Sequence, residues 1–164
     1  MKTQDNLATA FAGESQANRK YLFFAEQAEK EGFTNVAKLF RATAEAETIH
    51  ARGEFKAKGG IGTTAENLVA AKAGETYEFT SMYPPMLEDA KAEGNNEAAR
   101  VFGFALEAEK VHARLYEEAL ANLGNEPEGQ DYYLCPICGY IHKGTEPTSP
   151  CPICGAKQSI FKKF

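Results

Sequence analysis

The chain has 164 residues, of which 43% are hydrophobic and 25% are charged, and its formal net charge is −5. This length allows one ordinary domain and a small appendage, and the composition is that of a soluble globular protein. The acidity, without any cluster of lysine or arginine, argues against a nucleic-acid partner. No apolar run approaches the about 20 residues of a membrane span, and the N-terminal segment lacks the apolar core of a secretory signal, so we expect a cytoplasmic protein without a membrane partner.

Four long helical segments are predicted in the first three quarters of the chain, because apolar residues recur there at helical spacing. Each is followed by a glycine, and they run from about Gln4 to Glu31, Asn35 to Lys58, Thr64 to Glu93 and Asn96 to Leu123. Thr64 is the expected N-cap of the third helix, although Asn67 stands where a capping box would place glutamate. Asn95 or Asn96 is expected to cap the fourth. The pattern predicts an all-α four-helix bundle over residues 1–123.

A small metal-stapled domain is predicted at the C-terminus. Residues 124–131 are polar and contain glycine and proline, which is typical of a linker, and residues 132–164 are too few to fold around an ordinary core. All four cysteines lie in this last segment, in two Cys-Pro-Ile-Cys-Gly motifs, at Cys135, Cys138, Cys151 and Cys154. This spacing predicts one ion held by four thiolates rather than disulfides, and both iron and zinc suit such a site.

The sequence Glu-x-x-His occurs twice, at Glu47–His50 and at Glu109–His112, sixty-two residues apart. On a helix, positions i and i+3 lie about 60° apart around the axis and about 4.5 Å along it, so each pair can bind one metal ion. Surrounding residues repeat at the same offset; Tyr21, for example, corresponds to Tyr83. The two helices without the motif supply lone glutamates, Glu14 and Glu75.

These residues predict a two-metal carboxylate site in the centre of the bundle. Glu47 and Glu109 can bridge two cations, and His50 and His112 can each supply a terminal nitrogen. Several carboxylates could not stay charged in a bundle core without cations. Iron or manganese suits such ligands, and zinc is also possible. The alternative is that each glutamate lies on a solvated helix face.

The repeat is imperfect at one place in the third helix. Glu14 corresponds to Glu75 only at an offset of sixty-one, so one extra residue lies between Glu75 and Tyr83. A single inserted residue is often absorbed as a π-bulge, so we expect a bulge or kink there; a plain proline kink is the alternative, since two prolines follow. Glu78 lies one turn after Glu75 and has no counterpart, because Ala17 occupies the equivalent position. The site is therefore expected to be asymmetric.

A four-helix bundle with a doubled Glu-x-x-His and a C-terminal CPxCGY…CPxCG segment resembles the rubrerythrin family over essentially the whole chain. The resemblance implies a ferritin-like di-iron bundle fused to a rubredoxin-like domain that holds one iron on four cysteines. The implied metal ligands are Glu14, Glu47, His50, Glu75, Glu78, Glu109, His112, Cys135, Cys138, Cys151 and Cys154.

The resemblance also implies the residues at which catalysis takes place. In the family one iron moves between a carboxylate and a histidine with the redox state, and these correspond to Glu78 and His50. Tyr21 and Tyr83 match tyrosines of the family's pocket, where they can hydrogen-bond the ligands or act as redox-active neighbours. Ordinary buried tyrosines are the alternative reading of both.

The function that the resemblance implies is reduction of hydrogen peroxide to water. Electrons would come ultimately from NAD(P)H, through a donor protein such as rubredoxin or an NAD(P)H oxidoreductase, and pass from the four-cysteine iron to the di-iron site. One alternative is a ferroxidase or iron-handling protein. Another is a zinc-ribbon interaction module on a metal-stabilised bundle.

The segment between the second and third helices is short for a ferritin-like bundle, which needs a long crossover there. Each helix extends about ten residues past its ligand, so the link must run back about 30 Å. Residues 59–64 can span at most about 20 Å. We therefore expect a homodimer in which the chain is swapped between the second and third helices.

Overall fold

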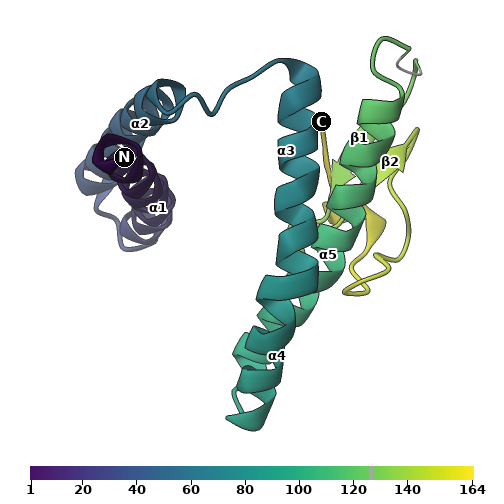
Figure 1. The fold of residues 1–164 in the computed structure, drawn as a ribbon. Helices are drawn as coiled ribbons and strands as arrows, with labels where there is room; N and C mark the ends of the chain where they lie inside the picture. The colour runs from purple at the N-terminus through teal and green to yellow at the C-terminus, as the bar shows by residue number, and fades with distance from the viewer. Residues whose placement is uncertain (126–127) are drawn as a thin grey trace. The chain divides into compact units, whose positions relative to one another are not determined.

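The computed structural model of the protein describes residues 1–125 and 128–164. The chain forms two compact units, Met1–Gly62 and Thr63–Phe164, and each is described by itself. Figure 1 shows the helices of both units and the strands of the second. Among the described residues, no helix combines the length and the apolar character that crossing a membrane requires.

The first unit is a hairpin of two helices, α1 (Lys2–Lys30) and α2 (Thr34–Ala57). Gly32 adopts a φ of 84°, which lets the chain turn sharply, and the N–H of Phe33 donates to the carbonyl of Ala28 at 2.8 Å. Small side chains allow the helices to approach closely, since Ala25, Ala28 and Ala37 form the buried core. The larger side chains of the hairpin therefore lie outside this buried core.

A buried asparagine also joins the two helices of this hairpin. The Nδ2 of Asn18 donates to the carbonyl of Ala44 at 2.6 Å and to the Oγ1 of Thr48 at 2.8 Å. Both acceptors flank the helical turn that carries Glu47. These bonds therefore set the register of α1 against the ligand-bearing part of α2.

The second unit begins with α3 (Thr64–Tyr77), a π-helical turn (Glu78–Met82) and α4 (Tyr83–Ala92), all of which pack against α5 (Asn96–Ala121). The expected N-cap of α3 was wrong by one residue. Thr63 is the cap, and Glu66 completes a capping box: the Thr63 N–H donates to Glu66 Oε2 at 2.7 Å. Asn95, one of the two predicted candidates, caps α5, and its side chain accepts from the N–H of Ala98.

The predicted bulge in the third helical segment is confirmed as the π-helical turn. The N–H of Tyr83 donates to the carbonyl of Glu78, five residues earlier, instead of the carbonyl four residues earlier as in an α-helix. The wider turn accommodates the extra residue, and the proline pair follows at the start of α4. After this turn, the residues of the two repeats correspond again at an offset of sixty-two.

Matched aromatic pairs show that the repeat extends to the packing. Tyr21 lies 6.2 Å from Phe40 between ring centroids, and Tyr83 lies 6.2 Å from Phe102. The interplanar angles are 31° and 41°. Each pair joins the lone-glutamate helix of a hairpin, or its continuation, to the Glu-x-x-His helix.

The C-terminal part of the second unit is a small antiparallel sheet of order β2-β1-β3, formed by β1 (Asp131–Leu134), β2 (Ile141–Gly144) and β3 (Lys162–Lys163). A 3₁₀ turn spans Gln158–Ile160. The buried core consists of Cys135, Cys138 and Cys151. Helices followed by a small cysteine-stapled β domain confirm the predicted fold class.

Candidate metal centres

The first unit brings together three of the expected ligands: Glu14 from α1 with Glu47 and His50 from α2. Their donor atoms lie within 4.8 Å of one another. The Nδ1 of His50 lies 2.9 Å from Glu47 Oε2 and 3.9 Å from Glu14 Oε2. The side chain of His50 is 57% exposed. This cluster contains the three ligands that the first repeat was expected to supply.

The second unit repeats the same arrangement with Glu75, Glu109 and His112. Their donor atoms also lie within 4.8 Å of one another. The Nδ1 of His112 lies 2.6 Å from Glu109 Oε2 and 3.9 Å from Glu75 Oε2. The repeat in the sequence therefore places equivalent ligands at nearly equivalent distances. The difference is exposure, since the side chain of His112 is only 17% exposed.

In both clusters the pKa of the lone glutamate is raised, and in the second cluster a proton takes the place that a cation could fill. Burial, a hydrogen bond with Glu109 and its negative charge raise the pKa of Glu75 to about 8. The hydrogen bond with Glu47, together with desolvation, raises the pKa of Glu14. In each cluster the lone glutamate is thus hydrogen-bonded to the glutamate of the Glu-x-x-His motif. Two carboxylates this close are a good fit to a cation, which would remove the repulsion between them.

His112 is predisposed to hold a positive charge in the metal-free protein. Burial lowers the pKa of its ring, but the hydrogen bonds to Glu109 and to the Gly139 carbonyl outweigh burial and raise the pKa above its ordinary value. Burial acts to raise the pKa of Glu109, but its hydrogen bonds with His112 and Glu75 outweigh burial and lower that pKa. The glutamate is thereby kept as a carboxylate, ready to bind a cation.

Glu78, the unmatched glutamate, lies at the start of the π turn, beside the second cluster but outside both groups of three donors. Its charge contributes to raising the pKa values of Glu75 and Tyr83. Desolvation is the main cause of the raised pKa of Tyr83, followed by the charge of Glu109. Tyr83 is therefore a neutral phenol next to carboxylates. Tyr21 packs instead between Phe24 and Phe40.

Tyr116 was not singled out from the sequence. It lies one turn after His112, and burial, followed by the charges of Glu75 and Glu109, raises its pKa. It lines a hollow of about 530 Å³ together with Glu75 and His112. The signal was available, because position i+4 from a ligand lies on the same helical face.

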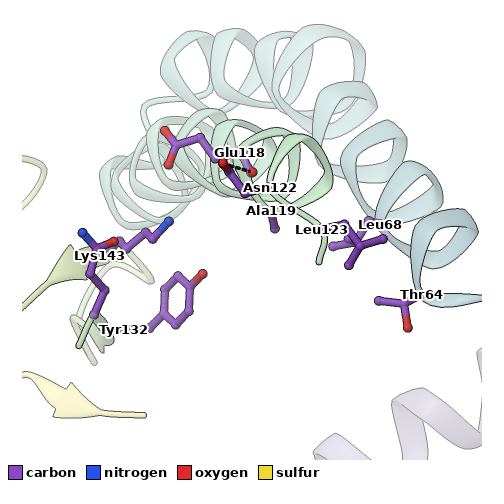
Figure 2. A pocket seen from close by; sticks show the side chains of 9 residues that line it. Thr64, Leu68, Glu118, Ala119, Asn122, Leu123, Tyr132 and Lys143 are labelled. Atoms are coloured by element: carbon purple, nitrogen blue, oxygen red, sulfur yellow. Dashed lines mark hydrogen bonds between the residues drawn. The ribbon is translucent and has the colours of Figure 1, made fainter. Parts of the chain in front are cut away.

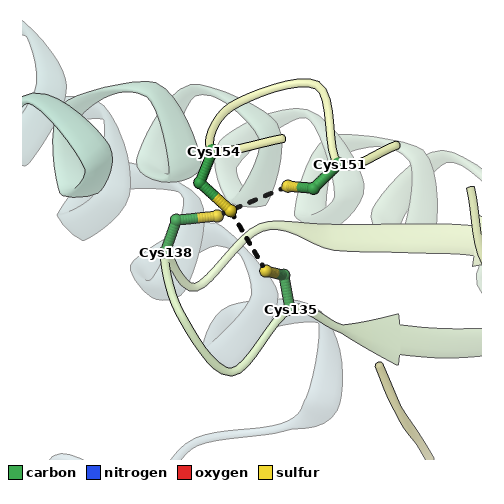
Figure 3. Close-up of side chains that lie close together, drawn as sticks. All are labelled: Cys135, Cys138, Cys151 and Cys154. Carbon is green, nitrogen blue, oxygen red and sulfur yellow. Dashed lines mark hydrogen bonds between the residues drawn. The ribbon is translucent and has the colours of Figure 1, made fainter. Parts of the chain in front are cut away.

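The four cysteines converge from two matched loops (Figure 3). The Sγ atoms of Cys135 and Cys154, and those of Cys138 and Cys151, are 3.6 Å apart, and all four lie within 4.8 Å. A tetrahedral ion with metal–sulfur bonds of about 2.3 Å requires sulfurs about 3.8 Å apart, so the donor set fits one ion.

Glycine after each second cysteine shapes these loops. Gly139 and Gly155 have φ values of 80° and 75°. Their N–H groups donate to the carbonyls of Cys135 and Cys151 at 3.0 and 2.9 Å. The next N–H in each loop, from Tyr140 or Ala156, donates to the sulfur of the second cysteine. Such bonds stabilise thiolate and tune a bound metal.

One contact joins the cysteine loops to the second carboxylate cluster. The Nε2 of His112 donates to the carbonyl oxygen of Gly139 at 2.8 Å. Phe104 of α5 packs against the cysteine cluster nearby. The sequence motifs gave no sign of a carbonyl directed at a ligand of the other site.

Comparison with known proteins identifies both parts of the chain. A family model described as rubrerythrin matches residues 5–120, and a model of the rubredoxin-like domain of rubrerythrin matches residues 133–162. The chain belongs to the rubrerythrin family. The residues matched by the rubrerythrin model include both carboxylate clusters, and those matched by the rubredoxin-like model include all four cysteines.

Relatives match along almost the full chain. Nigerythrin of Nitratidesulfovibrio vulgaris is 39% identical over 176 residues, covering 99% of this chain and 86% of that protein. Rubrerythrin-2 of Clostridium acetobutylicum is 38% identical over 181 residues, covering 99% and 96%. A solved structure of partially reduced nigerythrin has a TM-score of 0.61 at 38% identity, covering 99% of this chain and 86% of that one. Another is described as fully reduced and all ferrous.

Rubrerythrins bind iron, and the donor sets of this chain fit that metal. Carboxylates with imidazole suit a non-heme iron pair, and four thiolates suit a single iron of the rubredoxin type. The cofactors implied for this chain are therefore two non-heme irons and one cysteine-bound iron.

Proposed function

We propose that the protein is a cytoplasmic peroxidase that reduces hydrogen peroxide to water, with electrons passed from the rubredoxin-like iron to the di-iron centre. The reaction consumes two electrons and two protons for each peroxide and yields two water molecules. When bound, the iron pair supplies the electrons that cleave the O–O bond. The proposed ligands of that pair are the two carboxylate clusters and Glu78.

The observation that carries this proposal is the hydrogen bond between His112 and Gly139. It places a ligand of the carboxylate cluster 2.8 Å from the backbone of a cysteine loop. Cys138 precedes Gly139 directly, so only a few covalent bonds and one hydrogen bond separate its sulfur from the imidazole. A storage protein or an interaction module has no need of this link, whereas an electron-transfer enzyme does.

The residues around the site can hold and deliver the protons that the reaction consumes. Glu75 retains a proton near neutral pH, because its pKa is raised to about 8. Tyr83 and Tyr116 remain neutral phenols beside the carboxylates and can each donate a hydrogen bond. We propose that Glu78 and His50 replace each other as ligands at one metal position when the redox state changes. We propose Tyr21 as a neighbour of the first cluster, which contains Glu14.

The test is rapid mixing of anaerobically reduced, iron-loaded protein with hydrogen peroxide, followed by absorbance at the cysteine-bound iron. Oxidation by peroxide is expected to be much faster than oxidation by air. Glu78→Ala should slow the peroxide reaction, while Glu107→Ala, an exposed glutamate on α5, should not. Oxidation no faster than with air would exclude the peroxidase. Incorporation of many irons per chain would favour iron storage, and a colourless zinc protein would favour the interaction module.

We further propose that a second copy of the chain completes each iron pair. Only residues 58–63 join α2 to α3, and six residues reach at most about 20 Å. Returning along helices that extend about ten residues past Glu47 and start about ten before Glu75 requires about 30 Å. In the swapped homodimer, the hairpin of one chain pairs with the second unit of the other.

An apolar stripe on the ligand-bearing helical face of the second unit supports this assembly. Leu68 lies two turns before Glu75 on α3, and Ala119 lies two turns after His112 on α5. Both line the hollow of about 340 Å³ drawn in Figure 2 and the larger one that reaches the ligands, and Tyr132 of the C-terminal sheet lines both hollows as well. A helical face that carries ligands and apolar residues in one stripe is suited to packing against another hairpin.

Complementation of two inactive variants tests the swap. One variant carries Glu47→Ala and His50→Ala, and the other carries Glu109→Ala and His112→Ala. In a swapped dimer, co-expression yields mixed dimers with one intact centre, so activity returns to at most half. Without a swap every centre contains a damaged half, and activity stays absent. Light scattering that finds a monomer at micromolar concentration would also rule out the dimer.

The electron donor belongs to the same proposal. A rubredoxin or an NAD(P)H oxidoreductase is the proposed partner, because a cysteine-bound iron exchanges one electron at a time with such carriers. Coupling of NAD(P)H oxidation to peroxide consumption, dependent on an added carrier, is the measurement that checks it.

A further inference from the structure

His112 is held from both sides, and its repeat counterpart is not. Its Nδ1 lies 2.6 Å from Glu109, and its Nε2 lies 2.8 Å from the carbonyl oxygen of Gly139. The side chain is 17% exposed, against 57% for His50. A donor at Nε2 leaves Nδ1 as the nitrogen that faces the carboxylates once it loses its proton. The carbonyl of Gly139 therefore selects the tautomer that binds a cation at this cluster.

The position of that carbonyl depends on the cysteine loop. The N–H of Gly139 donates to the carbonyl of Cys135 at 3.0 Å, and the N–H of Tyr140 donates to the sulfur of Cys138. Both bonds belong to a loop that closes around the thiolates. A domain this small needs its metal to stay folded. The carbonyl is thus presented to His112 only while the loop is closed.

Close packing brings the loop and α5 together at this point. A Cβ added to Gly139 would lie 3.8 Å from the Cβ of Ala108, which is itself 1% exposed. Ala108 immediately precedes Glu109 on α5. Phe104, one turn earlier, packs against the cysteine cluster. A small residue at position 108 lets the loop approach closely enough for the hydrogen bond.

We propose that Gly139 is a positioning residue for the carboxylate site, so that metal on the four cysteines strengthens metal binding at His112. Removal of such an outer hydrogen bond to a metal-bound histidine typically weakens metal affinity about 10–100-fold. Binding free energies are reciprocal, so metal at His112 also strengthens metal binding at the cysteines by the same factor. The inference rests on the proposed di-metal site, but it requires no peroxide and no electron transfer.

The test measures affinity for Mn(II), which binds carboxylates and imidazole but has little affinity for thiolates. Full-length protein with zinc on the cysteines is titrated with Mn(II), and the free ion is counted by electron paramagnetic resonance. The double variant Cys135→Ser and Cys151→Ser, which cannot close the cysteine site, is expected to bind Mn(II) about 10–100-fold more weakly. Zinc added to the metal-free wild type should restore its affinity for Mn(II). Because zinc has no redox activity, this result would show that the effect comes from the position of the loop.

A second variant keeps every ligand. Ala108→Leu pushes the loop away from α5 and is expected to weaken Mn(II) binding, whereas Ala108→Ser fits the same space and retains it. One zinc per chain on the cysteines of both variants shows that the loop is closed. In ¹⁵N spectra of zinc-loaded protein, the Nε2–H signal of His112 should be protected from exchange in Ala108→Ser and lost in Ala108→Leu. Equal Mn(II) affinity in all four proteins would overturn the inference, whatever the rate with peroxide.

Discussion

Metal binding at the second cluster should release protons, because the metal-free cluster holds them in place of a cation. Glu75 has a pKa raised to about 8 by burial and by the hydrogen bond with Glu109. His112 also has a raised pKa, since its hydrogen bonds to Glu109 and Gly139 outweigh the effect of burial. Both groups must lose a proton before their donor atoms can bind a cation.

The magnitude follows from the pKa of Glu75. A group of pKa about 8 is about 90% protonated at pH 7, about half protonated at pH 8 and about 10% protonated at pH 9. Glu75 alone should therefore release about 0.9 proton per chain at pH 7 and about 0.1 at pH 9. His112 adds to the release near neutral pH, since its pKa is also raised.

The assay is titration of the zinc-loaded protein with Mn(II) in weakly buffered solution that contains a pH indicator. Zinc on the cysteines removes the protons that thiols would otherwise contribute. Release of about one proton or more per chain at pH 7, falling steeply toward pH 9, is the expected result. Less than about half a proton at pH 7 would mean that Glu75 is already ionised, and the reasoning from its burial and its neighbour would be refuted.

Three further predictions concern stability. Asn18→Ala removes two hydrogen bonds between α1 and α2 and should cost about 1–2 kcal/mol in urea unfolding of the zinc-loaded protein, whereas the exposed Asn35→Ala should change it by less than about 0.5 kcal/mol. The metal-free protein should lose thermal stability as pH rises between about 4.5 and 8, since the folded state holds the proton of Glu75 that the unfolded state releases; a melting temperature that rises over this range would contradict the shift. Removal of metal from the cysteines should unfold residues 131–164 while the helices persist, which separate tyrosine fluorescence and far-ultraviolet dichroism measurements can check; simultaneous loss of both signals would contradict it.

Much of the fold and of the site could be predicted from local spacing. Glu-x-x-His pairs, cysteine pairs and glycines at helix ends act over a few residues, so the sequence alone indicates their geometry. The extra residue near Glu78 was also predictable, because an internal repeat provides its own reference for counting. The structure has a π turn at that place.

Other features depend on contacts between distant segments. The cap of α3 was misplaced because two consecutive threonines compete for the same role, and only the position of Glu66 decides between them. The carbonyl of Gly139 reaches His112 across 27 residues, through packing that no local pattern encodes. The pKa of Tyr116 is raised by burial and by the charge of Glu75, which lies on another helix. Such pairings follow from how helices pack rather than from any single motif.

The π turn has a consequence for the proposed two-metal centre and for how its two positions would fill. Matched hairpins, with ring pairs both 6.2 Å apart, would by themselves build a centre whose two positions are equivalent. Two ions at equivalent positions would be indistinguishable, and neither would be loaded or reduced first. One inserted residue places the unmatched Glu78 beside the second cluster only, so the two positions of the proposed centre would differ. If the proposed centre is loaded or reduced in steps, this single inserted residue would be the source of the difference between its two positions.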